Sequence, residues 1–164
     1  MKRILACVAV CGFLVLVNGL SFASEYPVNK STAEELKALA TDQTTYTAGL
    51  QTEISKNVGT LQSAEVGLAF TKTMELTLIN AALSSLYQMF QLEYAHAANE
   101  EKNSQALEIT KNYVTNTMTF VEGAIKRASE FSLQNKEVQA KFSGVPDYLA
   151  KDMLLLDKIS QELQ

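Results

Sequence analysis

The chain has only two prolines, Pro27 and Pro146, so the long stretch between them lacks the residue that most strongly breaks a helix. Across residues 28–145, apolar side chains recur every three or four positions, which is the period of an amphipathic helix. Alternating β-branched runs bounded by turn dipeptides, which mark strands, are missing. The sequence therefore predicts an all-α protein.

Breaks in the apolar pattern divide the chain into about four amphipathic helices of unequal length. We expect them at about residues 32–58, 64–98, 104–131 and 147–163, and in an alternative interpretation the third continues to residue 142. Pro146 suits the first turn of the fourth helix, because it has no amide hydrogen to leave unbonded. Short connections make consecutive helices antiparallel, so we predict an up-and-down bundle.

The first helix opens at "STAEEL", where Ser31 with Glu34, or Thr32 with Glu35, matches a capping box. Its apolar stripe is interrupted by one polar residue, Gln43. The stripe consists of Leu36, Leu39, Tyr46, Leu50, Ile54 and Val58.

The second helix carries two apolar stripes and no charge between Glu75 and Glu93. The stripes are Leu76, Ile79, Leu83, Leu86 and Phe90, and Leu78, Ala82, Met89 and Leu92. A helix that is apolar around so much of its girth is usually central in a bundle. A membrane-spanning interpretation conflicts with polar residues inside it, among them Asn80, Gln88 and Gln91.

The third helix is predicted to follow a turn at residues 99–104, "NEEKNS". Its residues at intervals of seven form a seam like that of a coiled coil, and further residues lie beside the seam. The seam is Leu107, Val114, Val121 and Ala128, with Thr110, Met118 and Ile125 beside it. The short fourth helix buries Leu149, Met153, Leu156, Ile159 and Leu163. Because it is short, we expect an uncovered apolar stretch on the first or second helix, which a homodimer would hide.

The N-terminus has the three parts of a secretory signal: the basic Lys2 and Arg3, an apolar run over residues 4–17, and small residues at Ser21 and Ala23. The apolar run of about 14 residues is shorter than the ~20 that a spanning helix needs. We therefore predict a signal peptide over residues 1–23, a short extension over 24–30 and one bundle domain over 31–164. The alternative is an uncleaved anchor.

The composition after the predicted cleavage narrows the classes of function. Cys7 and Cys11 both lie in the signal, so the mature chain has no thiol for a disulfide, a zinc site or catalysis. Without Lys2 and Arg3, 12 basic residues face 18 acidic ones, a net charge of −6. The basic residues form no cluster, so we expect no nucleic-acid partner.

The only histidine, His96, lies three residues after Glu93, and a Glu-x-x-His pair is one half of the ligand set in di-iron helical bundles. Further glutamate ligands would have to come from Glu53, Glu108 or Glu122. The chain has no second histidine, and the pair lies near a helix end, where a histidine is favoured by the helix dipole. We therefore expect no metal site here.

The sequence gives little support for a haem site or for catalysis. A haem between the helices would use His96 with a methionine, and Met74, Met89, Met118 and Met153 are available, but methionine at helical spacing usually fills a core. No nucleophile and base pair can be recognised. The tyrosines, spread over all four helices, are expected at core margins with their hydroxyls in water, or lining a slot for a ligand.

These observations predict an exported, non-enzymatic helical bundle that binds an unidentified partner protein or small ligand in the periplasm or outside a bacterial cell. We expect no catalytic residue, no cofactor and no stable membrane span after signal cleavage. The alternative is a metal- or haem-binding four-helix bundle that uses His96 with Glu93. A second alternative is an enzyme of unknown type.

Overall fold

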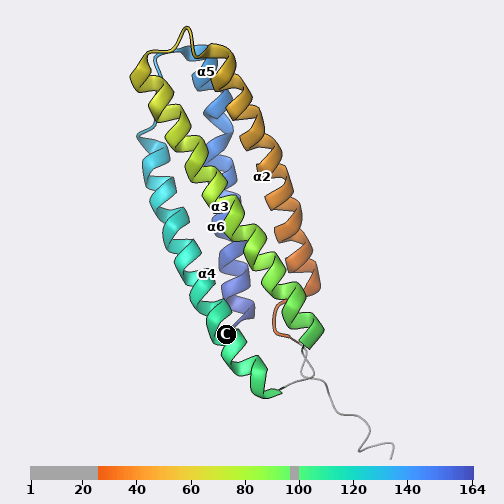
Figure 1. Cartoon of the computed structure of the whole chain (residues 1–164). Helices are drawn as coiled ribbons and strands as arrows, with labels where there is room; N and C mark the ends of the chain where they lie inside the picture. The colour runs from red at the N-terminus through yellow and green to blue at the C-terminus, as the bar shows by residue number, and fades with distance from the viewer. Residues whose placement is uncertain (1–25, 97–99) are drawn as a thin grey trace, which may run out of the picture.

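The computed structural model describes residues 26–96 and 100–164, within which four long helices pack against one another (Figure 1). These are α2 (Lys30–Asn57), α3 (Ser63–His96), α4 (Glu100–Ser129) and α6 (Val145–Glu162). This part of the chain contains no strand, so the predicted all-α class is confirmed. The predicted signal peptide over residues 1–23 and the predicted end of the second helix at residues 97–98 lie outside the described residues.

The first turn of α2 is held by a distant side chain. The N-cap residue Asn29 makes no side-chain capping bond. Instead the Glu162 carboxylate, at the end of α6, accepts hydrogen bonds from the backbone N and Nδ2 of Asn29, at 2.9 and 3.0 Å, and from Thr32 Oγ1 at 2.7 Å. Neither predicted capping box, at Ser31 or at Thr32, forms, because the Thr32 hydroxyl bonds to another helix and the helix begins before both residues.

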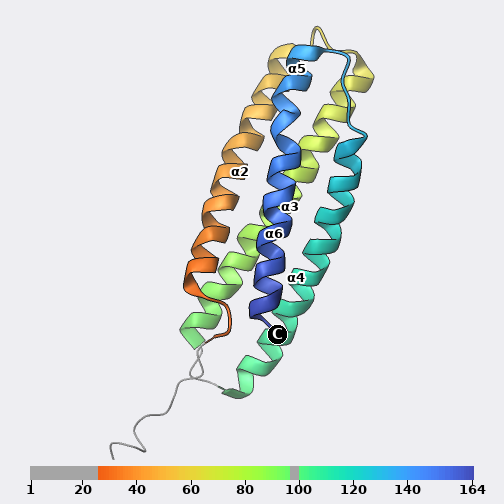
Figure 2. The same cartoon turned by 180° about the vertical axis from the view of Figure 1, so that it is seen from behind.

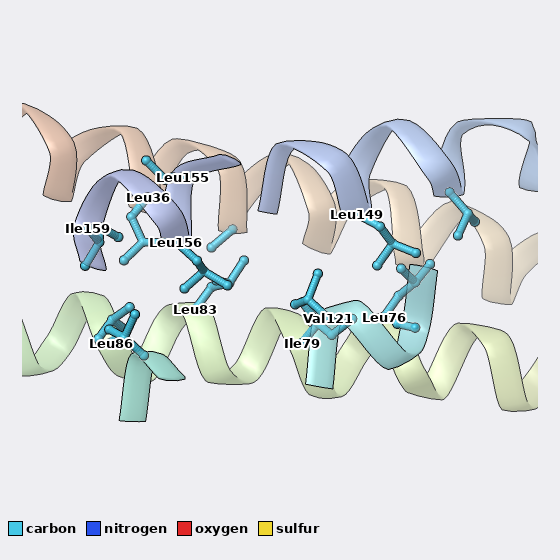
Figure 3. Packing of buried hydrophobic residues seen from close by; sticks show 14 of the residues in the cluster. Leu36, Leu76, Ile79, Leu83, Leu86, Val121, Leu149, Leu155, Leu156 and Ile159 are labelled. Carbon is cyan, nitrogen blue, oxygen red and sulfur yellow. The ribbon is translucent and has the colours of Figure 1, made fainter. Parts of the chain in front are cut away.

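One side of α3 forms the middle of the hydrophobic core. Its first apolar stripe is completely buried, with 0 % of each side chain exposed: Leu76, Ile79, Leu83, Leu86 and Phe90. Figure 3 shows leucines of α3 and α6, among them Leu83 and Leu156, meeting in this core. α6 opens with Pro146 in its first turn, as its missing amide hydrogen predicts.

The second apolar stripe of α3 faces outwards. Leu78 is 54 % and Leu92 60 % exposed, and Ala82 and Met89 are half-buried. The prediction that this helix is central is therefore wrong, because each helix of a four-helix bundle packs on two neighbours and keeps an outer side. No helix in the described part of the chain combines the length and apolar character that crossing a membrane requires.

α4 begins at Glu100, so the turn predicted at residues 99–104 is wrong from that residue onwards. Acidic residues suit the positive end of a helix dipole, which explains why a polar stretch can start a helix here. Val114 and Val121 are buried, as the predicted seam requires, but Ile125 is 39 % exposed and Ala124 is buried in its place.

The fourth column of the bundle is built from three pieces. After a non-helical segment, α5 (Lys136–Lys141) and the 3-10 turn η1 (Phe142–Gly144) stand above α6 (Figures 1 and 2). The predicted continuation of the third helix to residue 142 is wrong, because Asn135 Oδ1 accepts the amides of Glu137 and Val138 and starts a new helix. α5 packs on α2, so the fourth column is longer than the sequence predicts.

The segment before α2 belongs to the core. Val28 is 1 % and Tyr26 9 % exposed. The Tyr26 ring lies 6.0 Å from the Phe90 ring and 5.6 Å from the Tyr94 ring, between centroids. Tyr94 Oη donates a hydrogen bond to the backbone oxygen of Val28 at 3.0 Å. This segment therefore closes one end of the bundle against α3.

Candidate functional site

α2 and α6 meet along a seam that is held by polar groups. α2 packs mainly on α3, and α6 mainly on α4, so the contact between α2 and α6 is the lighter one. Lys158 Nζ lies 2.8 Å from Glu35 Oε2, and both side chains are largely exposed. Exposed ion pairs contribute only about 0–1 kcal/mol. The stability of the seam therefore depends on the groups buried within it.

A buried amide and a buried acid meet in the middle of the seam. Gln43 and Asp152 are each 0 % exposed, and Gln43 Nε2 donates a hydrogen bond to Asp152 Oδ2 at 3.0 Å. The other oxygen of each group, Gln43 Oε1 and Asp152 Oδ1, is buried with no hydrogen-bond partner among the described residues. A buried polar atom left without a partner costs about 1–3 kcal/mol.

A proton on Oδ1 of Asp152 would give both unpaired atoms a hydrogen-bond partner. Burial raises the pKa of Asp152 to about 7, and the hydrogen bond from Gln43 opposes this rise only in part. A protonated Oδ1 can donate to Gln43 Oε1, which would close a neutral, doubly hydrogen-bonded pair. The seam therefore contains a group that titrates near neutral pH.

Two stacked tyrosines lie further along the seam. The rings of Tyr46 and Tyr148 stack with centroids 4.7 Å apart, and Tyr46 Oη donates to the backbone oxygen of Lys141 at 2.7 Å. Burial raises the pKa of Tyr46 to about 12. The Tyr46 hydroxyl therefore ties α2 to the end of α5, and Tyr46 lies at the margin of the core as predicted.

An open groove of about 520 Å³ lies between α2 and α6, towards the end of α6. Three leucines line it: Leu155 is buried, Leu39 is half-buried, and Leu154 is 74 % exposed. The remaining lining residues are charged or polar: Glu35, Lys151, Asp157, Lys158 and Gln161. The groove therefore has an apolar lining that includes one strongly exposed leucine.

The outer face of α3 is the second candidate surface. We define it by four side chains that are 46, 65, 54 and 60 % exposed: Phe70, Met74, Leu78 and Leu92. Their spacings of four and fourteen residues place them along one side of the helix. Glu75, which follows Met74 in the sequence, forms ion pairs with Lys72 and Arg127: its Oε2 lies 2.6 Å from Lys72 Nζ and its Oε1 2.5 Å from an Arg127 nitrogen. The outer face of α3 is therefore uncharged, with the exposed Ser85 and Gln88 on the same side between Leu78 and Leu92.

The predicted alternative metal pair lies at the end of α3. Glu93 is half-buried, and its charge contributes to the raised pKa of Tyr26, although burial is the larger cause. The side chain of His96 lies outside the part that the structure describes. Within the described residues, no group of three or more histidine, cysteine, aspartate or glutamate side chains could hold a metal ion. Glu53, Glu108 and Glu122 are not brought together with Glu93 there.

The sequence pointed to one half of the buried pair and missed the other. Gln43 interrupts an apolar stripe, which is visible in the sequence. Asp152 was missed, although it lies three residues after Leu149 and four before Leu156, on the face that those two leucines bury. A charged residue at a buried position of one helix, with an amide at a buried position of another, is the signal that would have found the pair.

Comparisons of the chain with protein-family models, with curated proteins and with solved structures found no match.

Proposed function

We propose that this protein is an exported, non-enzymatic helical bundle that binds a partner protein through the outer face of α3. The observation that carries the proposal is the exposure of Phe70, Met74, Leu78 and Leu92 on one uncharged helix side. Burying a large apolar side chain completely contributes about 1.5–3 kcal/mol, so covering these four provides a real driving force for binding. A helix surface encloses a small molecule poorly, which favours a protein partner.

The proposed setting is the periplasm or the outside of a bacterial cell, and it rests on the signal-like residues 1–23. If the signal is cleaved, the N-terminus of the protein recovered from its host begins near Ser24. Protein that retains Lys2 and stays in the inner membrane would instead be anchored. N-terminal sequencing of the native protein distinguishes the two results.

The proposal includes an up-and-down order of the four helices. It is supported by the contacts of Glu162, at the end of α6, with Asn29 and Thr32, at the start of α2. An order of this kind keeps all connections short and leaves the sides of the bundle free for binding.

Photo-crosslinking in the cells that produce the protein tests the binding face. A photoreactive amino acid at Ala81, which is exposed on α3 within the uncharged stretch, should give a discrete adduct with one partner protein. The matched control is Ala48, which is also an exposed alanine but lies on α2. Adducts that are absent, or equal at both positions, would contradict the proposal.

Two substitutions then test the chemistry of the face. Met74→Lys and Leu78→Lys place charges on exposed positions, so they should abolish the adduct from Ala81 without lowering the helix content. Ile125→Lys, at an exposed position of α4, should leave the adduct unchanged. Equal loss in all three variants would point to a general effect of charge and against the outer face of α3.

A further inference from the structure

We propose that the groove between α2 and α6 is the contact surface of a symmetric homodimer, in which α6 of one copy crosses antiparallel to α6 of the other at Leu154. The surface is distinct from the outer face of α3, which lies on the opposite side of the bundle: α3 is in front in Figure 1 and α6 in Figure 2. The inference is therefore independent of the proposed function.

The shape of the surface fits a second copy of the same chain. Leu154 is 74 % exposed and lines the groove of about 520 Å³ together with Leu39 and Leu155. In a two-fold dimer, each surface must be complementary to itself. Leu154 meets that condition, because a two-fold axis at Leu154 lets the Leu154 side chains of the two copies pack on each other at the grooves.

The charges around Leu154 select the antiparallel arrangement. Lys151 and Asp157 lie three residues before and three residues after Leu154, and both are exposed. A two-fold axis at Leu154 places Lys151 of each copy opposite Asp157 of the other, which gives two contacts between opposite charges. In a parallel arrangement Lys151 would face Lys151 and Asp157 would face Asp157. Like charges placed opposite each other disfavour that arrangement.

The next position along the helix agrees with this register. Lys158, four residues after Leu154, would lie opposite Ala150, four residues before it. Lys158 is already paired with Glu35 of its own copy, and the small Ala150 side chain, which is exposed, leaves room for that pair. The antiparallel register therefore brings no like charges together within one turn of Leu154 on either side.

The proposed contact surface between the two copies is small, so the dimer should be weak. It is centred on one protruding leucine and one groove, and stable interfaces usually bury about 800 Å² on each partner. We expect dissociation constants between micromolar and millimolar. Sedimentation of the protein purified from its host, over that range of concentration, should show a reversible monomer–dimer equilibrium.

A charge exchange tests the register. Lys151→Asp and Asp157→Lys should each weaken the dimer several-fold, because each single substitution places like charges opposite each other in both contacts. The double variant Lys151→Asp/Asp157→Lys restores opposite charges and should dimerise like the original protein. These residues are exposed, so the variants should fold normally. A double variant as weak as the single ones would overturn the proposed register.

A second pair of variants tests the protrusion. Leu154→Lys should weaken the dimer at least ~10-fold, because it puts two charges at the centre of the contact. Ile125→Lys, which changes an exposed apolar residue on α4, should have no effect. A protein that stays monomeric at millimolar concentration, or that binds another apolar molecule in the groove without dimerising, would overturn the proposal.

Discussion

A carboxyl group surrounded by leucines is tolerated in a core only when it is neutral or well paired. Asp152 lies on the buried face of α6 beside Leu149, Leu155 and Leu156, all of them at most 8 % exposed. Within the described part of the chain, its one hydrogen bond comes from Gln43, a neutral amide. The neutral form of Asp152 is therefore favoured in the folded protein, and a proton on Oδ1 would also give both unpaired oxygens a partner.

This arrangement predicts a stability that depends on the proton of Asp152. Its pKa is raised from 3.8 to about 7 by burial, so between those values the unfolded chain is ionised while the folded chain is not. The free energy of unfolding should fall by about 1 kcal/mol per pH unit from about pH 4 to about pH 7, and the contribution should be constant outside that window. Urea unfolding at a series of pH values, followed by circular dichroism, measures this slope.

The matched variant is Asp152→Asn, which has nearly the same shape and carries no charge. Its amide can donate to Gln43 Oε1 and accept from Gln43 Nε2 at every pH, so the slope between pH 4 and pH 7 should disappear. Asp157→Asn, at an exposed site on the same helix, should keep it. An unchanged slope in Asp152→Asn would show that Asp152 is ionised in the folded protein.

At the scale of the helices, α3 illustrates how far periodicity alone can predict burial. Two apolar stripes were recognisable, and one of them is the core. Nothing in the spacing of α3 tells which stripe is covered, because that depends on where α2 and α4 pack. Likewise, the α2 cap at Glu162 could not be predicted, since it arises from contacts between residues far apart in the chain. The break before α5 combines a local cap, Asn135, with a distant contact from Glu65 that the sequence does not reveal.

The two stripes should respond differently to the same substitution. Leu83→Asp should unfold the protein, because Leu83 is 0 % exposed and an unpaired buried charge costs several kcal/mol out of the usual ~5–15 kcal/mol. Leu78→Asp, five residues earlier and 54 % exposed, should leave a cooperative thermal transition close to that of the original. Circular dichroism during heating measures both. A stably folded Leu83→Asp variant would show that this face is not the core.

The break between α4 and α5 depends on one carboxylate. Glu65 Oε1, at the start of α3, accepts the backbone amides of Gln134 at 2.6 Å and of Asn135 at 3.1 Å, and Oε2 accepts that of Gln62 at 3.2 Å. These bonds, first of all that from Asn135, hold the pKa of Glu65 below its usual value. Their contribution is therefore present at neutral pH and lost as the pH falls through the lowered pKa.

Replacing this carboxylate should loosen the break locally. Glu65→Ala removes both acceptor oxygens, so hydrogen exchange should speed up at the amides of Gln134 and Asn135. Glu137→Ala, an exposed change in α5, is the control and should leave these rates unchanged. If the two amides exchange at the original rate in Glu65→Ala, the carboxylate does not hold the segment.

At the scale of the whole molecule, the two proposed surfaces lie on opposite sides of the bundle (Figures 1 and 2). A dimer that forms through α6 would leave both outer faces of α3 uncovered and pointing away from each other. The dimer would then present two equal binding faces. A partner that carries several binding sites would contact both faces at once and bind the dimer more tightly than it binds one copy. Self-association and partner binding would not compete.

The proposed dimer has a definite overall length, which small-angle X-ray scattering can measure. α3 has 34 residues and is about 51 Å long at 1.5 Å per residue, which sets the length of one copy. Leu154 lies about five residues, or ~7 Å, beyond the middle of the fourth column, so an antiparallel contact there offsets the two copies by only ~15 Å. The maximum dimension should therefore grow modestly on dimerisation, while the cross-section doubles. A particle that approaches ~100 Å would mean end-to-end contact and would contradict a dimer through the side of α6.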